Sequence, residues 1–253
     1  MTSLAPGQAF APTGTVTFEV ASIKPSSPGE EYVGIHPTPG GQRYIAAKSP
    51  LKDFLYVAYQ VKPEQITGGP AWVETELYDM NAEAERPSSI EDLHIMLQNL
   101  MTERFKLRFH FETKELPAYA MSVDKGGPKN LKPHPNASGG DVHLDGTAYE
   151  SGPEKWNAHC ASMNFFIWRL SPWYDRPFIN QTNLDGCFDF ELTFTKREEP
   201  LAVSPAQGAA APIEASGPTI FEALQKQLGL KLEAKKGPVA SMVIDHAEKP
   251  SEN

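Results

Sequence analysis

The chain has 253 residues, of which 40% are hydrophobic and 22% are charged, and its formal net charge at pH 7 is −9. This acidic balance argues against nucleic acid as a main partner, because phosphate binding needs a surplus of lysine and arginine on one face. It also disfavours electrostatic attachment to anionic lipid, and the sequence has no run of 18 apolar residues that could span a membrane. We therefore expect a globular protein of one large domain or two ordinary ones.

Residues 1–14 form a lead-in that is rich in proline, glycine and alanine, and we expect it to be disordered. The segment has neither the basic region nor the apolar run of a signal peptide. It resembles what remains when a signal has been removed and a start methionine added. An ordinary cytosolic N-terminus has the same composition, so both alternatives stay open.

Residues 15–123 predict a first half of mixed α and β structure. Alternating hydrophobic residues indicate strands, and apolar residues at helical spacing indicate two helices. Ser49 is expected to cap the first helix, with Pro50 at its first position, and Ser88 or Ser89 to cap the second. The expected elements are a strand at 15–23, a hairpin of 33–35 with 44–47, a helix from 50, a strand at 76–84, a helix from 90, a strand at 105–111, a turn at 115–117 and a strand at 118–123.

Residues 124–153 are rich in glycine and proline and predict a linker, which a second α+β half at 154–249 follows. Within that half, residues 197–217 are rich in alanine, proline and glutamate and predict a mobile surface insert. Residues 250–253 are a polar tail. The second half is expected to contain helices near 162–172 and 218–228 and strands near 186–195, 230–234 and 239–246.

Several segments of the second half match segments of the first half in residue type and in order. Tyr44 corresponds to Trp156, for example, and Asp79 corresponds to Asp189. Such correspondences predict an internal duplication and two pseudo-symmetric halves, with helices packed on mainly antiparallel sheet. The matched segments are 42–59 with 154–171, 78–80 with 188–190, and 96–107 with 223–232.

The two cysteines belong to no matched pair. Cys160 lies just before a predicted helix, and Cys187 lies beside a predicted strand. Two cysteines at sites that the fold could make neighbours suggest a disulfide and an oxidising compartment. Two unrelated buried thiols would give the same sequence, so both alternatives stay open.

The seven histidines show neither the His-x-x-x-His nor the His-x-His spacing that is typical of metal sites. The nearest pattern is at residues 141–145. Strand alternation would place Asp141, His143 and Asp145 on one face, where their oxygens and imidazole could bind a divalent cation. The simpler interpretation is a short polar run exposed to solvent. We expect no cofactor.

Two sets of residues have patterns that occur in hydrolases. Ser49 and Lys52 match the Ser-x-x-Lys pattern in which a lysine activates a serine, but the companion Lys-Thr-Gly and Ser-Asp-Asn elements are absent. Asp79 and Asp189 could meet as a carboxylate pair, although the flanking turns of aspartic proteases are missing. A helix cap for Ser49 and hydrogen bonds to neighbouring groups for the two aspartates are the simpler roles.

Aromatic residues gather around the first predicted helix of the second half. They could line a groove for a small molecule or a glycan, and packing in the core is the simpler interpretation. These residues are Trp156, Trp168, Trp173 and Tyr174.

Specific motifs extend from near the start of the chain to its end. They are Phe18–Pro25, Gly68–Trp72, Tyr78–Asp79, Leu100–Leu107, Lys125–Pro128, Arg176–Pro177 and Val243–Asn253. In these motifs the chain resembles a soil-associated acidobacterial family of unknown function, DUF3738. The resemblance implies an exported protein, and it implies sensing or binding, since related domains occur beside membrane metallopeptidases of the antibiotic-sensor type. It supplies no catalytic residues, and Cys160 and Cys187 look like departures from the usual pattern.

We therefore expect a secreted or periplasmic binding or interaction module without evident catalytic activity. Its partner would be a small molecule, a glycan or an envelope protein. One alternative is a secreted hydrolase that uses Ser49 and Lys52 or the acids Asp79 and Asp189. The other is an assembly domain of the cell envelope.

Overall fold

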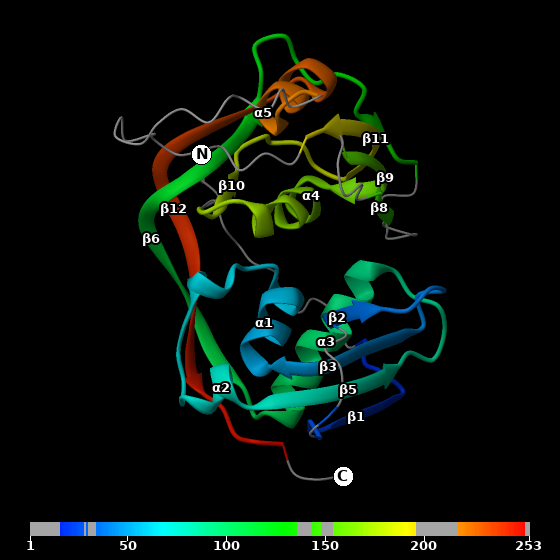
Figure 1. Cartoon of the computed structure of the whole chain (residues 1–253), viewed down its shortest axis with the longest axis vertical. Coiled ribbons are helices and arrows are strands. Elements are labelled where there is room, and N and C mark those ends of the chain that lie inside the picture. The colour runs from blue at the N-terminus through cyan, green and yellow to red at the C-terminus, as the bar shows by residue number, and fades with distance from the viewer. Residues whose placement is uncertain are drawn as a thin grey trace, which may run out of the picture. The chain divides into compact units, whose positions relative to one another are not determined.

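The computed structural model of the chain describes residues 16–27, 29, 34–135, 143–147, 154–195 and 217–250, with the backbone alone for 143–147. These residues divide into two compact units. The first unit contains the described residues up to Leu116 and from Lys236 onward, and the second contains those from Pro117 to Lys235. The long strands β6 (Arg108–Val123) and β12 (Leu230–His246) contribute residues to both units (Figure 1).

The first unit contains an antiparallel sheet with the strand order β1-β5-β3-β2. The predicted hairpin is confirmed, since Ile35 lies opposite Ala46. Helices α1 and α3 pack against each other, and Figure 1 shows them beside this sheet. The elements are β1 (Val20–Pro25), β2 (Gly34–Pro37), β3 (Arg43–Pro50), α1 (Leu51–Tyr59), β4 (Ile66–Gly68), α2 (Trp72–Thr75), β5 (Leu77–Glu83) and α3 (Ile90–Arg104), with a 3-10 turn at Pro63–Gln65.

The core of the first unit lies where the apolar faces of α1 and α3 meet. Their side chains recur at helical spacing and are almost completely buried. Each such side chain contributes roughly 1.5–3 kcal/mol of stability by leaving water. The residues are Leu51, Phe54, Leu55, Leu93, Leu97 and Met101.

The predicted helix cap is correct for α3 and wrong for α1. The Ser89 hydroxyl accepts a hydrogen bond from the amide of Asp92, which closes the first turn of α3. In α1 the N-cap is Pro50, which makes no side-chain cap, and Ser49 is a strand residue opposite Tyr78. Because β3 keeps its pairing with β5 through Pro50, the serine stays in the strand and does not cap the helix.

The second unit contains a second antiparallel sheet with the order β7-β11-β9-β8. Strands β7 and β8 lie within 124–153, where the sequence predicted a linker. The elements are β7 (Lys132–Pro133), β8 (His143–Thr147), β9 (Glu154–Ser162), α4 (Met163–Leu170), a 3-10 turn at Ser171–Trp173, β10 (Phe178–Asn180), β11 (Cys187–Phe194), and α5 (Ile220–Ala223), which continues into a π turn at Leu224–Leu228.

The predicted turn at 115–117 is wrong, because β6 continues through Pro117. The parallel strand β10 pairs with β6 only along Tyr119–Met121, so a proline at 117, which has no amide hydrogen, removes no donor from that pairing. The predicted break between 234 and 239 is wrong for a similar reason. Strand β12 runs through Gly237 and Pro238 and pairs with β4 only along Met242–Ile244.

The α+β class is confirmed. In the described part of the chain, five helices accompany three four-stranded sheets, the third with the order β10-β6-β12-β4. Parallel pairing joins β10 to β6 and β4 to β12, while the other two sheets are antiparallel throughout. None of the described helices is long and apolar enough to cross a membrane.

His94 of α3 is a buried titratable residue in the first unit, with 4% of its surface exposed. Its Nδ1 lies 3.2 Å from the side-chain amide nitrogen Nε2 of Gln60, and its ring centroid lies 6.2 Å from that of Tyr44. Burial lowers the pKa of His94 to about 4, because the charged form would lose its hydration. The imidazole is therefore neutral in the folded protein at neutral pH.

We predict that His94 makes the folded state sensitive to acid. The free energy of unfolding should fall between pH 6.5 and about 4, because the unfolded histidine binds a proton that the folded one does not. A pKa difference of this size corresponds to about 3 kcal/mol. Urea unfolding over this pH range should show a shallower fall in His94→Leu. Leu97→Ala, as a control, should lose about 2–5 kcal/mol at every pH and keep the wild-type slope. An unchanged slope in His94→Leu would contradict the prediction.

Candidate metal centre

A β-bulge in the second unit brings two residues of β9 opposite one residue of β11. The register shifts between Phe188 and Phe190, so that His159 and Cys160 both face Asp189. Cys160 takes up the extra length with a positive φ of 47°, which is uncommon for any residue except glycine. The bulge therefore places a backbone amide and an imidazole at the same carboxylate.

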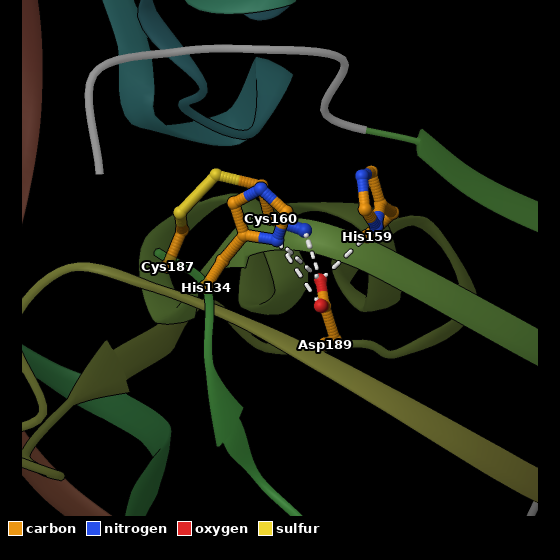
Figure 2. Close-up of a disulfide and its surroundings, with 5 residues drawn as sticks. All are labelled: His134, His159, Cys160, Cys187 and Asp189. Atoms are coloured by element: carbon orange, nitrogen blue, oxygen red, sulfur yellow. Dashed lines mark hydrogen bonds and ion pairs between the residues drawn. A yellow bond between two sulfur atoms is a disulfide. The ribbon is translucent and has the colours of Figure 1, made fainter. Parts of the chain in front are cut away.

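Asp189 is the centre of a cluster of hydrogen bonds and ion pairs (Figure 2). Its Oδ1 accepts a hydrogen bond from the Cys160 amide at 2.8 Å. Both carboxylate oxygens lie 3.1 Å from Nδ1 of His134, and Oδ1 lies 3.2 Å from Nδ1 of His159. The two imidazole rings meet edge to face, with their centroids 4.5 Å apart.

Strand β7 positions His134. The strand pairs with β11 through Pro133, and the amide of His134, the next residue, donates to the Cys187 carbonyl at 3.0 Å. Prolines on both sides, at 133 and 135, restrict the backbone around the histidine. The His134 side chain is 12% exposed, whereas that of His159 is 53% exposed. The cluster thus has one enclosed side and one open side.

Asp189 is a carboxylate at neutral pH. Burial by itself would raise the pKa of Asp189, but the hydrogen bonds from the Cys160 amide and His134, with the nearby charges of His134 and His159, lower this pKa below its usual value. The cluster therefore presents one negative charge between two imidazoles.

Cys160 and Cys187 form a disulfide, with their Cα atoms 4.6 Å apart. The predicted pairing is confirmed, and the alternative of two unrelated thiols is wrong. Both cysteines also contact the cluster through their backbones, Cys160 by its amide and Cys187 by its carbonyl. Figure 2 shows the disulfide next to the ring of His134.

The first unit has the same bulge without histidines. The register of β3 and β5 shifts so that Ala47 and Lys48 both face Asp79, and Lys48 has a positive φ of 51°. The Lys48 amide donates to Asp79 Oδ1 at 3.1 Å, and the Ser26 hydroxyl donates to the same oxygen at 2.6 Å. In this bulge the aspartate contacts a backbone amide, a serine hydroxyl and, at 4.0 Å, the ammonium group of Lys24, without any imidazole.

The two bulges can be compared position by position. Ser26 follows β1 as His134 follows β7, and the amide of Ser26 donates to the Leu77 carbonyl at 2.9 Å. The second unit thus has a histidine or a cysteine at each of four positions where the first unit has another residue. The pairs are Ser26 with His134, Ala47 with His159, Lys48 with Cys160 and Leu77 with Cys187.

The cluster has the composition of a metal site. One ligand atom each from His134, His159 and Asp189 lies within 4.8 Å of the others. The separations of 3.1 and 3.2 Å between nitrogen and oxygen are close to the roughly 3.3 Å edge of a tetrahedron whose metal–ligand bonds are about 2.0 Å. Two imidazoles and a carboxylate are ligands that suit divalent transition metals. Solvent could complete the coordination on the exposed side of His159.

Comparison with known proteins places the chain in a family. Residues 52–247 match the family described as protein of unknown function, DUF3738. The chain belongs to this family. The match confirms the resemblance found in the motifs, and it includes every residue of the second-unit bulge and its disulfide. No curated protein and no solved structure matches the chain.

In this DUF3738 protein the four residues predicted for hydrolysis have separate partners. Ser49 is fully buried, and its hydroxyl donates to the Ala47 carbonyl at 3.3 Å. Lys52 lies 2.8 Å from the carboxylate of Glu74. Asp79 belongs to the first unit and Asp189 to the second, and each carboxylate accepts the amide of its own bulge.

The metal ligands predicted at 141–145 fall largely outside the described residues. Asp141 lies outside them, and for His143 and Asp145 only the backbone in β8 is described. In that backbone, His143 lies opposite His159 in the register of β8 and β9.

The predicted aromatic residues have different surroundings. Trp156 is buried in the second unit, with its ring 5.3 Å from the ring of Phe194. Trp173 lies 5.1 Å from Trp156 and remains 38% exposed. Trp168 packs against a phenylalanine of its own helix, and Tyr174 lies near other aromatic rings of the unit.

Sequence reasoning missed His134 and His159 as a pair. The spacing rules apply within one segment, whereas these histidines follow or occupy strands that are far apart in the sequence. One signal was available, because Lys132-Pro133-His134 resembles Lys24-Pro25-Ser26. This similarity indicates a site only when the strand pairing is known, because the pairing places the first segment beside Asp79 and the second beside Asp189.

We predict that the disulfide contributes about 3–4 kcal/mol to the stability of the second unit. It closes a loop with a sequence separation of 27, and closing such a loop removes conformational entropy from the unfolded chain. Urea unfolding of wild type and of Cys160→Ser/Cys187→Ser should show this loss. Tryptophan fluorescence is the appropriate signal, since three of the four tryptophans lie in the second unit.

A reductant provides the control for this prediction. Tris(2-carboxyethyl)phosphine should move the unfolding midpoint of wild type toward that of the double variant, and it should leave the variant unchanged. Equal midpoints for the oxidised wild type and the variant would show that the crosslink contributes nothing.

Proposed function

We propose that this protein is an extracytoplasmic binding module that holds one divalent transition-metal ion at His134, His159 and Asp189. The observation that carries the proposal is the convergence of two imidazoles on one carboxylate, from β9, β11 and the end of β7. Histidines bind a metal in their neutral form, and two neutral imidazoles with one carboxylate have a net charge of −1, which favours a cation. Zn²⁺ is the probe that suits this set of ligands best.

The comparison with the first unit supports a role for the histidines beyond folding. Asp79 holds an equivalent bulge with a serine hydroxyl and a backbone amide, so the fold of the sheet requires no imidazole there. An ordinary ion pair joins one histidine to one carboxylate, whereas two imidazoles from different parts of the chain approach Asp189. Two imidazoles and one carboxylate that converge from different strands are a set of ligands that a divalent metal ion can bind.

The exposure of the cluster supports binding with open coordination positions. Three protein ligands leave at least one position of a tetrahedral ion for water or another small ligand. The half-exposed side chain of His159 lies at this open side, while His134 is enclosed. The site is thus suited to an ion that exchanges or that contacts a further ligand, in keeping with a binding or sensing protein.

The disulfide supports the extracytoplasmic location. Disulfides form and persist in oxidising compartments and are rare in the cytosol of most organisms. Cys160 and Cys187 are the only cysteines of the chain, and they are bonded to each other. The export that the family resemblance implies is consistent with this location.

The internal duplication predicted from the sequence remains a proposal. It is supported by the similar orders β1-β5-β3-β2 and β7-β11-β9-β8, and by the bulge with its aspartate in both sheets. It bears on function because it makes the first-unit bulge, which contains no histidine, a reference for the second-unit bulge.

We predict that the metal-free protein binds one Zn²⁺ per chain, as measured by isothermal titration calorimetry after treatment with a chelator. His134→Ser/His159→Ala installs the residues of the first unit, so it should fold normally and bind Zn²⁺ about 100-fold more weakly or not at all. Loss of a residue that only orients a metal ligand lowers metal affinity about 10–100-fold. Loss of two ligands themselves should therefore have at least this effect.

A matched control is available in the first unit. His110 is half exposed and lies 3.0 Å from Asp245 and 3.5 Å from Glu112, and among the described residues this group is not one that could hold a metal. His110→Ala should keep the wild-type affinity and stoichiometry. The proposal is wrong if wild type binds no Zn²⁺, or if the double histidine variant binds it as tightly as wild type.

A further inference from the structure

We propose that the Cys160–Cys187 disulfide sets the affinity of the metal centre, so that the centre is complete only in an oxidised protein. This inference rests on the proposed function, and it assigns the two cysteines as positioning residues. They would hold the ligands in place without contacting the ion.

All three ligands are connected to the disulfide through the main chain. The Cys160 amide donates to Asp189 at 2.8 Å, and His159 is the residue before Cys160. The Cys187 carbonyl accepts the amide of His134 at 3.0 Å. The crosslink therefore fixes the distance between the strand segment that carries His159 and the backbone group that holds His134.

The first unit shows that the bulge itself needs no crosslink. Lys48 and Leu77 stand at the positions of the two cysteines and make the corresponding backbone contacts to Asp79 and Ser26. These two residues cannot be joined covalently. The second unit thus has a crosslink at the bulge that carries the imidazoles, and not at the one that lacks them.

The second-unit bulge also has more need of a constraint. The side chain of Asp79 is 11% exposed, whereas that of Asp189 is 35% exposed. Solvent therefore competes more strongly for the carboxylate of Asp189 and for the amide that it accepts. With the disulfide present, the positions of the metal ligands do not depend on these solvent-exposed hydrogen bonds alone. A site whose ligands are already in position binds more tightly than a flexible one.

The chemistry of opening is thiol–disulfide exchange. A dithiol reductant supplies two electrons and two protons, the bond between the sulfurs of Cys160 and Cys187 breaks to give two thiols, and the reductant forms its own disulfide.

Cys160 is 1% exposed and Cys187 is 8% exposed, so exchange in the folded protein is slow. The redox state is therefore set when the chain folds. Folding in a reducing compartment would leave the centre weak, and folding in an oxidising one would complete it.

The test compares the Zn²⁺ affinity of three forms of the full chain by isothermal titration calorimetry. They are the oxidised wild type, wild type reduced in mild denaturant and refolded in tris(2-carboxyethyl)phosphine, and Cys160→Ser/Cys187→Ser. We expect the last two to bind Zn²⁺ about 10-fold or more weakly than the first, which is the usual effect of losing groups that orient a ligand.

A matched variant separates positioning from loss of stability. Leu192 of β11 is fully buried, so Leu192→Ala should destabilise the second unit without touching the bulge, and it should keep the wild-type Zn²⁺ affinity. Circular dichroism confirms that each form is folded during the titration. If Leu192→Ala weakens Zn²⁺ binding as much as loss of the disulfide does, the effect is general and the inference is wrong.

Two other outcomes would also overturn the inference. Equal affinities of the oxidised protein and the double serine variant would mean that the crosslink does not position the ligands. Tighter binding by the reduced protein would mean that the free thiols act as ligands themselves. Both outcomes leave the proposed function intact, provided that oxidised wild type binds Zn²⁺ and His134→Ser/His159→Ala does not.

Discussion

The hydrogen bond from the Cys160 amide to the Asp189 carboxylate is the contact on which the candidate centre depends. It stabilises a backbone conformation that residues other than glycine rarely adopt, and that conformation brings His159 to the carboxylate. The carboxylate also fixes the ring of His134, and the carbonyl of Cys187, two residues earlier in β11, holds the backbone of that histidine. A single side chain thus connects the geometry of the sheet to the position of both imidazoles.

Much of the architecture could be predicted because it depends on local patterns. The apolar stripe of α1, the Ser89 cap of α3 and the hairpin of β2 and β3 each follow from neighbouring residues. The errors arose where pairing between strands overrides a local signal. Ser49 has the sequence of a helix cap, yet the pairing of β3 with β5 keeps it in a strand. Pro117 has the sequence of a turn, yet β6 passes through it.

The candidate centre depends on information that the sequence does not display directly. Asp189 attracted attention as one of two matched acids, and the pairing of Cys160 with Cys187 was foreseen as one of two alternatives. What no local pattern provided was the register, which determines that His159 faces Asp189 and that the residue after β7 reaches the same carboxylate. Spacing rules detect ligands on one helix or one strand, and these ligands come from three separate places in the chain.

The bulge of the first unit has a consequence for how members of this family should be compared. Serine and alanine occupy the positions of the two histidines there, and the sheet, its aspartate and its left-handed residue are still in place. The fold and the chemistry therefore depend on different residues. The same sheet and aspartate thus occur with and without the two imidazoles, so two relatives with the same fold can differ in the side chains that they present at this bulge.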